Sequence, residues 1–322
     1  MPVIYLVIPC YNEEEVLPET IRQLTDKLNR MTTAGTISAE SKILLADDGS
    51  RDRTWQLISQ MTRENPYVEG IKLAHNRGHQ NALLAGLMTA APLCDCSISL
   101  DADLQDDIEV LDEFVKKYSE GCDIVYGVRK KRDTDTAFKK ISAEGFYKIM
   151  KALGVDVVFN HADYRLMSKR ALEALGEYRE VNLFLRGIVP TIGYKTDCVY
   201  YDRHERFAGE SKYPLKKMIT LALDGITSFS VRPLKLISNL GILISILSIF
   251  GLLYALISHF TGNTVAGWTA TICSIWLLGG LQMLSLGIVG EYVGKIYSEV
   301  KQRPRYIIES FLKNAYGEKD SK

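Results

Sequence analysis

The sequence lacks an excess of charge of either sign, because 39 basic and 39 acidic residues balance in a chain of 322. A basic field of the kind that attracts nucleic acid is therefore absent, and we expect no nucleic-acid partner. Internal repeats and low-complexity tracts are also missing. The length is sufficient for one sizeable α/β domain and a smaller second part.

Cysteine is scarce, and none of the six cysteines forms a C-x-x-C pair. Cys94 and Cys96 are spaced C-x-C, but two further ligands at the spacing of a zinc finger are missing. We interpret the cysteines as reduced thiols of a cytoplasmic domain. Met1–Pro9 contains no basic region and only a short apolar run, so we expect no signal peptide.

Charged residues are absent from Leu236 to Gly290, although they occur throughout the preceding chain. Within this segment, Leu236–Ile257 and Trp268–Val289 are each about 22 residues long. As helices they would reach about 33 Å, enough to cross a membrane. A hairpin buried in a soluble core is the alternative, but helices of that kind usually show a polar face. The sequence therefore predicts a multi-pass membrane protein with two transmembrane helices.

Lysine and arginine flank this hairpin on both sides, but the linker 259–267 contains neither. By the positive-inside rule, both flanks lie in the cytoplasm and the linker lies outside. The second span contains Gln282 and ends in Gly290-Glu-Tyr-Val-Gly294; small residues four apart and a polar side chain in lipid suggest helix packing within or between chains, which leaves a homo-oligomer open. The predicted parts are a cytoplasmic domain (1–213), a juxtamembrane segment (214–235), the hairpin (236–290) and a cytoplasmic tail (291–322). The juxtamembrane segment mixes apolar and basic residues, as an amphipathic helix on a membrane surface does; a domain-closing helix is the alternative.

The first domain alternates short β-branched runs with amphipathic stretches, which predicts a mostly parallel sheet covered on both faces. The predicted strands are Val3–Ile8, Lys42–Ala46, Val68–Leu73, Ser97–Leu100, Asp123–Gly127, Tyr164–Met167 and Tyr194–Tyr201. The predicted helices are Glu13–Met31, Arg53–Glu64, Asn81–Ala90, Ile108–Tyr118, Phe138–Leu153 and Lys169–Tyr178. In such sheets the loops at the carboxyl ends of the strands carry the ligand site.

The most specific polar signal is Asp101-Ala-Asp103-Leu-Gln105, directly after an apolar run. Two carboxylates at a strand end can share a hard divalent cation, Mg²⁺ or Mn²⁺, which prefers oxygen ligands and bridges them to substrate phosphates. A lone D-x-D is more often a solvated turn. The position after a buried strand and the neighbouring motifs favour the metal site here.

Two further polar segments follow predicted strands. Asp47-Asp48-Gly49-Ser50 could accept hydrogen bonds from a base or a ribose, although Ser50 or Asp52 could instead cap the next helix. Pro9-Cys-Tyr11-Asn-Glu13-Glu14 places carboxylates at the end of the first strand; first-turn helix charge is the alternative for Glu13–Glu15.

In this order and at these intervals, the three segments resemble the family 2 glycosyltransferases with the GT-A, Rossmann-like fold. Asp163-Tyr-Arg165-Leu-Met resembles the D-[FY]-R-L-M segment of that family, and Arg206–Tyr213 resembles its R-x-x-G-x-S-K-[YL] loop. With the two predicted spans, the chain is similar to the bacterial polyprenyl-phosphate glycosyltransferases, relatives of dolichyl-phosphate mannose synthase. It departs from the pattern in Asp107-Ile108, where prolines are common, and in Ala162, where glycine is common.

The resemblance implies a role for each matching residue. The nucleotide of the donor would be lined by Pro9, Tyr11, Glu13, Asp47 and Asp48. The metal and the diphosphate would be held by Asp101 and Asp103, with Gln105 near the sugar or the metal. A mobile loop over the phosphates would contribute Arg206, Ser211 and Lys212. The acceptor phosphate would be contacted by Arg129 and Lys140. The sugar or the acceptor would be oriented by Asp163 and Arg165, for which a structural pair is an equal alternative.

The resemblance further implies inverting transfer of a sugar from a nucleotide-sugar, with UDP favoured, to polyprenyl (undecaprenyl) phosphate at the bacterial plasma membrane. A phosphate monoester is largely dianionic at pH 7, so the acceptor needs orientation more than a general base. A processive synthase would need more spans and a Q-x-x-R-W motif, which is absent. The remaining alternatives are another membrane-associated acceptor and a catalytically silent nucleotide-sugar-binding scaffold.

Overall fold

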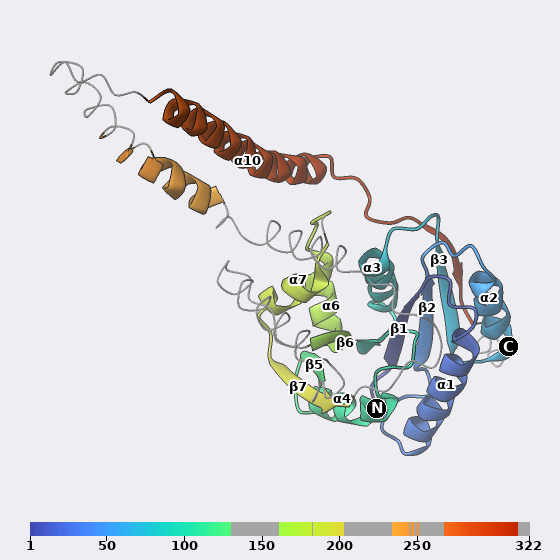
Figure 1. Cartoon of the computed structure of the whole chain (residues 1–322). Helices are drawn as coiled ribbons and strands as arrows, with labels where there is room; N and C mark the ends of the chain where they lie inside the picture. The colour runs from blue at the N-terminus through green and yellow to red at the C-terminus, as the bar shows by residue number, and fades with distance from the viewer. Residues whose placement is uncertain are drawn as a thin grey trace. The chain divides into compact units, whose positions relative to one another are not determined.

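The computed structural model describes residues 1–129, 161–181, 183–202, 234–244, 246–247, 250 and 267–314 (Figure 1). The chain divides into two compact units. The first comprises Met1–Glu144, Val157–Tyr213 and Gln302–Lys322, and the second comprises Gly145–Asp156 and Pro214–Lys301. The predicted helix Phe138–Leu153, the polar loop Arg206–Tyr213 and most of the juxtamembrane segment lie outside the described residues.

One sheet runs through the first unit. Its strands are β1 (Ile4–Cys10), β2 (Lys42–Asp47), β3 (Val68–Leu73), β4 (Cys96–Ser99), β5 (Ile124–Arg129), β6 (His161–Ser168), β7 (Thr196–Tyr201) and β8 (Ile308–Leu312). Their order is β7-β5-β6-β4-β1-β2-β3-β8. Pairing is parallel between β1 and β2, β1 and β4, β2 and β3, and β5 and β7, whereas β6 and β8 pair antiparallel with their neighbours. The predicted α/β class with a mostly parallel sheet is confirmed.

Helices of this unit cover the sheet on both faces. They are α1 (Leu17–Thr33), α2 (Thr54–Glu64), α3 (His79–Ala90), α4 (Leu111–Ser119), α6 (Lys169–Gly176) and α7 (Leu185–Thr191), with a short 3₁₀ turn η1 (Ile108–Val110) before α4. All seven residues of β1 are buried, as expected for a central parallel strand covered on both sides. Of these elements, the sequence patterns did not predict α7 or β8.

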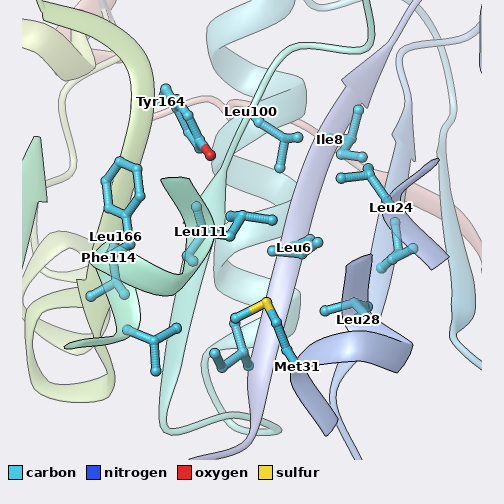
Figure 2. Packing of buried hydrophobic residues seen from close by; sticks show 14 of the residues in the cluster. Leu6, Ile8, Leu24, Leu28, Met31, Leu100, Leu111, Phe114, Tyr164 and Leu166 are labelled. Carbon is cyan, nitrogen blue, oxygen red and sulfur yellow. The ribbon is translucent and has the colours of Figure 1, made fainter. Parts of the chain in front are cut away.

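A hydrophobic core cluster joins alternate residues of β1 to α1 and α4 (Figure 2). Helix α1 buries Leu17, Ile21, Leu24 and Leu28, a spacing of three and four residues that forms one apolar face. Fully burying each such side chain stabilises the fold by about 1.5–3 kcal/mol. Figure 2 shows Leu6 and Ile8 of β1 beside this face, with Phe114 and Tyr164 on the far side of the cluster.

Helix α3 packs against β1 and β2 through small residues. A Cβ atom built at Gly86 would lie 2.4 Å from Val7 Cγ1, so only glycine allows this approach. The close contact holds the first turn of α3, which begins at His79, near the carboxyl end of the sheet. At this position His79 faces two carboxylates of the candidate site, Asp101 and Asp163.

A C-terminal strap, defined as Gln302–Asn314, returns to the sheet. Its strand β8 pairs with β3 from Gly70–Leu312 to Leu73–Ile308, and Ala74 N donates to Ile307 O at 3.0 Å. The strap thus covers the edge of β3 that would otherwise expose unpaired backbone groups. We predicted 291–322 as a cytoplasmic tail without a strand in it, because no local signal marks a pairing with residues so distant in the sequence.

The end of the strap is held by one amide side chain. Asn314 Nδ2 lies within hydrogen-bond distance of three backbone carbonyl oxygens, at Asn65 (2.7 Å), Thr62 (3.1 Å) and Val68 (3.4 Å). These carbonyls belong to α2, to Asn65 at its C-terminal cap and to Val68, the first residue of β3. One side chain therefore links the strap to two elements of the domain.

In the second unit, helix α10 (Trp268–Val300) is long and apolar. Its segment Leu277–Val300 is the one helix among the described residues with the length and hydropathy of a membrane span, and none of it is buried inside the protein. The predicted span Trp268–Val289 therefore lies on a helix that continues to Val300. The other predicted span, Leu236–Ile257, is described only in part, as a shorter apolar helix over Leu234–Ile244.

We predict that Asn314→Ala destabilises the first unit, because up to three carbonyl groups lose their donor. The expected loss is about 1–2 kcal/mol, or several degrees in Tm, measured by thermal unfolding of the full chain in detergent. Lys313→Ala, at an exposed neighbouring position, is the matched control and should change stability by less than about 0.5 kcal/mol. Equal Tm values for the two variants would contradict the assignment of Asn314.

Candidate active site

Six strands of the sheet end at one edge. Strands β1, β2, β3 and β4 are parallel to one another. Because β4 and β5 are both antiparallel to β6, β5 runs in the same direction as β4, and β7 is parallel to β5. The strand ends that meet there are Cys10, Asp47, Leu73, Ser99, Arg129 and Tyr201. Ligand sites of open α/β sheets lie at this edge. The predicted site residues that the structure describes are therefore brought to one side of the sheet.

The loops after β1 and β2 are held together by reciprocal hydrogen bonds. Asn12 N donates to Ser50 Oγ (3.0 Å), and Arg51 N donates back to Asn12 Oδ1 (2.9 Å). Asn12 has a φ of 54°, a left-handed conformation that asparagine tolerates better than most residues. Pro9 is buried at the end of β1, whereas Tyr11 on the loop is 39% exposed. Of these two predicted nucleotide contacts, Tyr11 therefore has a side chain that a ligand can reach, whereas Pro9 does not.

Asp47 and Asp48 are buried, and their oxygens hold neighbouring loops. Asp48 accepts hydrogen bonds from the backbone N–H groups of Arg77 (2.6 Å) and Gly78 (2.8 Å). Asp47 accepts from Ser50 N at 3.3 Å. Burial raises the pKa of both carboxyls, and these hydrogen bonds oppose that shift. Asp48 therefore connects the end of β2 to the loop before α3, while Asp47 closes the turn that follows β2.

The turn alternative for this segment is also realised. Gly49 has a φ of +66°, and a Cβ atom there would lie 2.9 Å from Asn76 N, so glycine is required for both reasons. Asp52 Oδ1 accepts a hydrogen bond from Thr54 N (3.0 Å) at the start of α2. Asp52 thus contacts the first residue of α2 from just before its N-cap, Arg53, whereas Ser50 Oγ accepts from Asn12 N of the neighbouring loop.

Asp101 and Asp103 lie on the turn that follows β4. Leu104 in this turn has a φ of 54°, and Gln105 N donates to Asp103 Oδ1 at 3.2 Å. Desolvation raises the pKa of Asp101 to about 6; His79 opposes this shift, and the neighbouring carboxylates, Asp163 foremost, add to it. The Asp101 side chain is nevertheless 37% exposed and open to a ligand.

The acidic turn fits a divalent cation. No group of three or more His, Cys, Asp or Glu side chains in the described part of the chain is arranged to hold a metal. A Mg²⁺ or Mn²⁺ site that substrate phosphates complete needs only one or two carboxylates from the protein. Repulsion among Asp101, Asp103 and Asp163 is a cost that a bound cation would relieve. Asp101 and Asp103 are the residues that would hold it.

Asp163 lies opposite Asp101 because of the register of β6. Ser99 pairs with Arg165 across β4 and β6, and the residues two further along face each other beyond the end of β4. His79 Nε2 is 3.7 Å from Asp101 Oδ1 and 3.7 Å from Asp163 Oδ2. The antiparallel strand therefore places a third carboxylate beside the acidic turn, with one imidazole between the two.

Two arginines bind the buried Asp163 carboxylate. Arg165 Nη2 donates to Oδ1 (2.7 Å), and Arg186 on α7 donates from Nη2 to Oδ2 (3.0 Å) and from Nε to Oδ1 (3.3 Å). Burial alone would raise the pKa of Asp163, but the charges of Arg186 and Arg165 and the contact with His79 hold it well below its ordinary value. The structural pairing of Asp163 with Arg165 is confirmed; whether either residue also orients the sugar stays a prediction.

Arg129, a predicted acceptor contact, is held by a second buried carboxylate. Its Nη2 lies 3.2 Å from Asp106 Oδ1, which also accepts a hydrogen bond from Tyr201 OH at 2.6 Å. Arg129 Nε in turn donates to the Tyr201 oxygen at 3.4 Å. Since Asp106 directly follows Gln105, the arginine is fixed to the same loop as the acidic turn.

The remaining predicted contacts are not described by the structure. Lys140, Arg206, Ser211 and Lys212 lie outside the described residues. Sequence reasoning missed Arg186, Asp106 and Tyr201 as partners in the site, and none of the predicted motifs contains His79. No motif contains Arg186. The one available signal for Asp106 was its position beside the acidic turn.

Comparison with known proteins identifies the family. The model for "Glycosyl transferase family 2" matches residues 5–176, more than half of the chain. This span contains β1 to β6 and the acidic turn. The chain belongs to the family 2 glycosyltransferases, and the GT-A fold that the motifs predicted is confirmed for its α/β domain.

Similar proteins extend along nearly the whole chain. "Uncharacterized glycosyltransferase YkoT" of Bacillus subtilis (strain 168) is 55% identical over 97% of this chain and 93% of the relative. The "Prophage bactoprenol glucosyl transferase homolog" of Escherichia coli (strain K12) is 39% identical over 96% of this chain and 99% of the relative. A solved mannosyltransferase, PcManGT from Pyrobaculum calidifontis in complex with GDP-Man and Mn²⁺, covers 94% of this chain and 88% of its own at 14% identity, with a TM-score of 0.43.

We predict that Asp101→Asn stabilises the cation-free protein at pH 7.5. A carboxyl pKa raised by folding means that the ionised form is less stable in the folded than in the unfolded chain. Because the side chain is partly exposed, the gain is discounted to about 1 kcal/mol, or about 2–4 °C in Tm. It should shrink as the pH falls below about 6, where Asp101 itself becomes protonated.

The same variant tests the cation site. Wild-type protein should gain Tm when Mg²⁺ or Mn²⁺ is added with a nucleoside diphosphate, and Asp101→Asn should lose most of that gain. An equal gain in the variant would remove Asp101 from the proposed ligands.

Proposed function

We propose that the protein transfers a sugar from a nucleotide-sugar, with UDP favoured, to polyprenyl phosphate at the cytoplasmic face of a bacterial plasma membrane. The transfer inverts the anomeric centre and depends on Mg²⁺ or Mn²⁺. The observation that carries this proposal is the cluster at the edge of the sheet. In this cluster Asp101, a proposed cation ligand, lies near His79 and Asp163. The proposed phosphate contacts Arg186 and Arg129 are each paired with a carboxylate. Relatives named bactoprenol glucosyl transferase match about the whole chain and support the lipid acceptor.

The donor site combines the loops after β1, β2 and β4. Tyr11 is exposed beside the loop that contains Asp48, and the acidic turn lies at the neighbouring strand end. A nucleotide placed across these loops would have its base at the β1–β2 side and its diphosphate at Asp101 and Asp103. A divalent cation, when bound there, would screen the negative charge that develops on the departing nucleoside diphosphate.

The acceptor explains why no general base is needed. A phosphate monoester is largely dianionic at pH 7 and can attack without losing a proton to the protein. Asp163 is unsuited to act as a base, because its low pKa gives it little affinity for a proton and its two arginine partners occupy its oxygens. Orientation of the phosphate by fixed cationic groups is then the main contribution of the protein. Arg129, fixed by Asp106 and Tyr201, is one such group.

Chain connectivity supports two membrane crossings. Strand β8 pairs with β3 inside the first unit, so the chain that leaves this unit after Tyr213 returns to the same side of the membrane by Gln302. If α10 crosses the membrane, a second crossing must lie between these points. The uncharged segment Leu236–Ile257 has the required length. We propose it as the first span, with the linker 259–267 outside the cell.

We predict that thiol labelling in intact cells will show the linker 259–267 outside the cell and the strap in the cytoplasm. A cysteine introduced at Asn263 in the linker should react with a membrane-impermeant maleimide, whereas one at Lys313 should react only after lysis. The wild-type chain is the control for its own cysteines, four of which are buried among the described residues. Labelling of Lys313→Cys in intact cells would contradict the cytoplasmic assignment.

The activity itself is tested with detergent-solubilised protein, undecaprenyl phosphate and a panel of radiolabelled nucleotide-sugars, with Mg²⁺, Mn²⁺ or EDTA. We expect a labelled lipid that extracts into chloroform and requires the cation. Asp103→Ala should reduce turnover below about 1% of wild type, because a metal ligand is lost. Asp26→Ala, an exposed carboxylate on α1, is the control and should retain activity. Failure of the folded wild-type protein with every donor would favour another acceptor or a silent scaffold.

A further inference from the structure

We infer that Arg186 is a further residue of this active site, whose guanidinium contacts a phosphate group of the substrates. The inference rests on the proposed function and extends it to a residue that lies in none of the sequence motifs. Arg186 is the second residue of α7, an element without a recognised role in the site.

The first argument is the position of Arg186. Its guanidinium contacts Asp163, and Asp163 shares the imidazole of His79 with Asp101 of the acidic turn. The arginine is therefore separated from the proposed cation ligand by one carboxylate and one imidazole. Any diphosphate held at Asp101 and any phosphate that attacks the sugar beside it would come close to this positive charge.

The second argument is the difference between the two arginines of the pair. The Arg165 side chain is 2% exposed, and its interior position leaves it no access to a ligand. The Arg186 side chain is 36% exposed, although it binds the same carboxylate. Asp163 thus neutralises a buried arginine and at the same time positions one that reaches the surface of the site. A planar guanidinium held in this way suits a phosphate.

The third argument is that the backbone around Arg186 is fixed from two other elements. Leu185 N donates to Gln80 Oε1 of α3 at 3.1 Å, and Leu185 O accepts from Arg165 Nη1 at 3.4 Å. Together with the contact to Asp163, α3, β6 and α7 all constrain this arginine. Such preorganisation reduces the entropy lost when a charged ligand is bound.

The phosphate could belong to the nucleotide-sugar or to the lipid, and steady-state kinetics separate these sources. We would measure KM for each substrate at saturating concentration of the other in wild type, Arg186→Lys and Arg186→Gln. Loss of one charged hydrogen-bonding contact should raise KM for the substrate that carries the phosphate by about 10- to 100-fold in Arg186→Gln. Arg186→Lys keeps the positive charge but lacks the planar guanidinium with its paired N–H donors. Its KM should therefore lie between those of wild type and Arg186→Gln.

Arg170 supplies a matched structural control. It is an exposed arginine on α6 that pairs with the buried Asp123, at the opposite end of the sheet from the site. Arg170→Gln should lower Tm as Arg186→Gln does, but it should leave both KM values within about twofold of wild type. Both variants leave a buried carboxylate with fewer partners, so comparing Arg170→Gln with Arg186→Gln separates this general loss of stability from a loss of substrate binding.

A rise in KM for the donor assigns Arg186 to its diphosphate, and a rise for the lipid assigns it to the acceptor phosphate; either supports the inference. If Arg186→Gln lowers Tm but leaves kcat and both KM values unchanged, Arg186 is structural and the inference is wrong. An inactive wild-type protein would instead refute the proposed function. In that case titration of UDP with Mg²⁺ into the same variants still tests the contact between Arg186 and the donor. An affinity for UDP that is equal in wild type and Arg186→Gln overturns that contact.

Discussion

The antiparallel register of β6 against β4 is the constraint on which the site depends. It places Asp163 opposite Asp101, two carboxylates that would repel each other at the carboxyl edge of the sheet. The repulsion is balanced by Arg165 and Arg186 on one side and by His79 on the other. Because these partners come from β6, α7 and α3, the charge balance of the site also holds the surrounding elements in place.

That balance explains how one carboxylate cluster can serve two purposes. Asp163 is saturated with donors and stays ionised, so it organises positive charge and does not exchange protons. Asp101 is the opposite case: it is partly exposed and crowded by like charges, and a bound cation would relieve that repulsion. Two aspartates within reach of one imidazole thus have different chemistry because their environments differ. The proposed transfer between two phosphate-bearing substrates would use both a cation site and fixed arginines.

Local patterns predicted most of the fold and the acidic part of the site. The β1 run is apolar throughout and α1 has one apolar face, so each was recognisable from neighbouring residues alone. Strand β8 and helix α7 were not, since five residues near the chain end and a seven-residue helix carry little periodic signal. For the same reason Arg186 was missed, because nothing adjacent to it in the sequence distinguishes it from a surface arginine.

The sequence by itself determined the class of the protein, since the order and spacing of the acidic motifs and the uncharged segment are local properties that folding does not alter. It also determined which strand ends would carry polar side chains. Only the tertiary structure decided which of those side chains meet: the pairing of Asp163 with Arg186, of Arg129 with Asp106, and of β8 with β3. These contacts join residues tens to hundreds of positions apart, and they exist only once the strand register and the packing of the helices have been established.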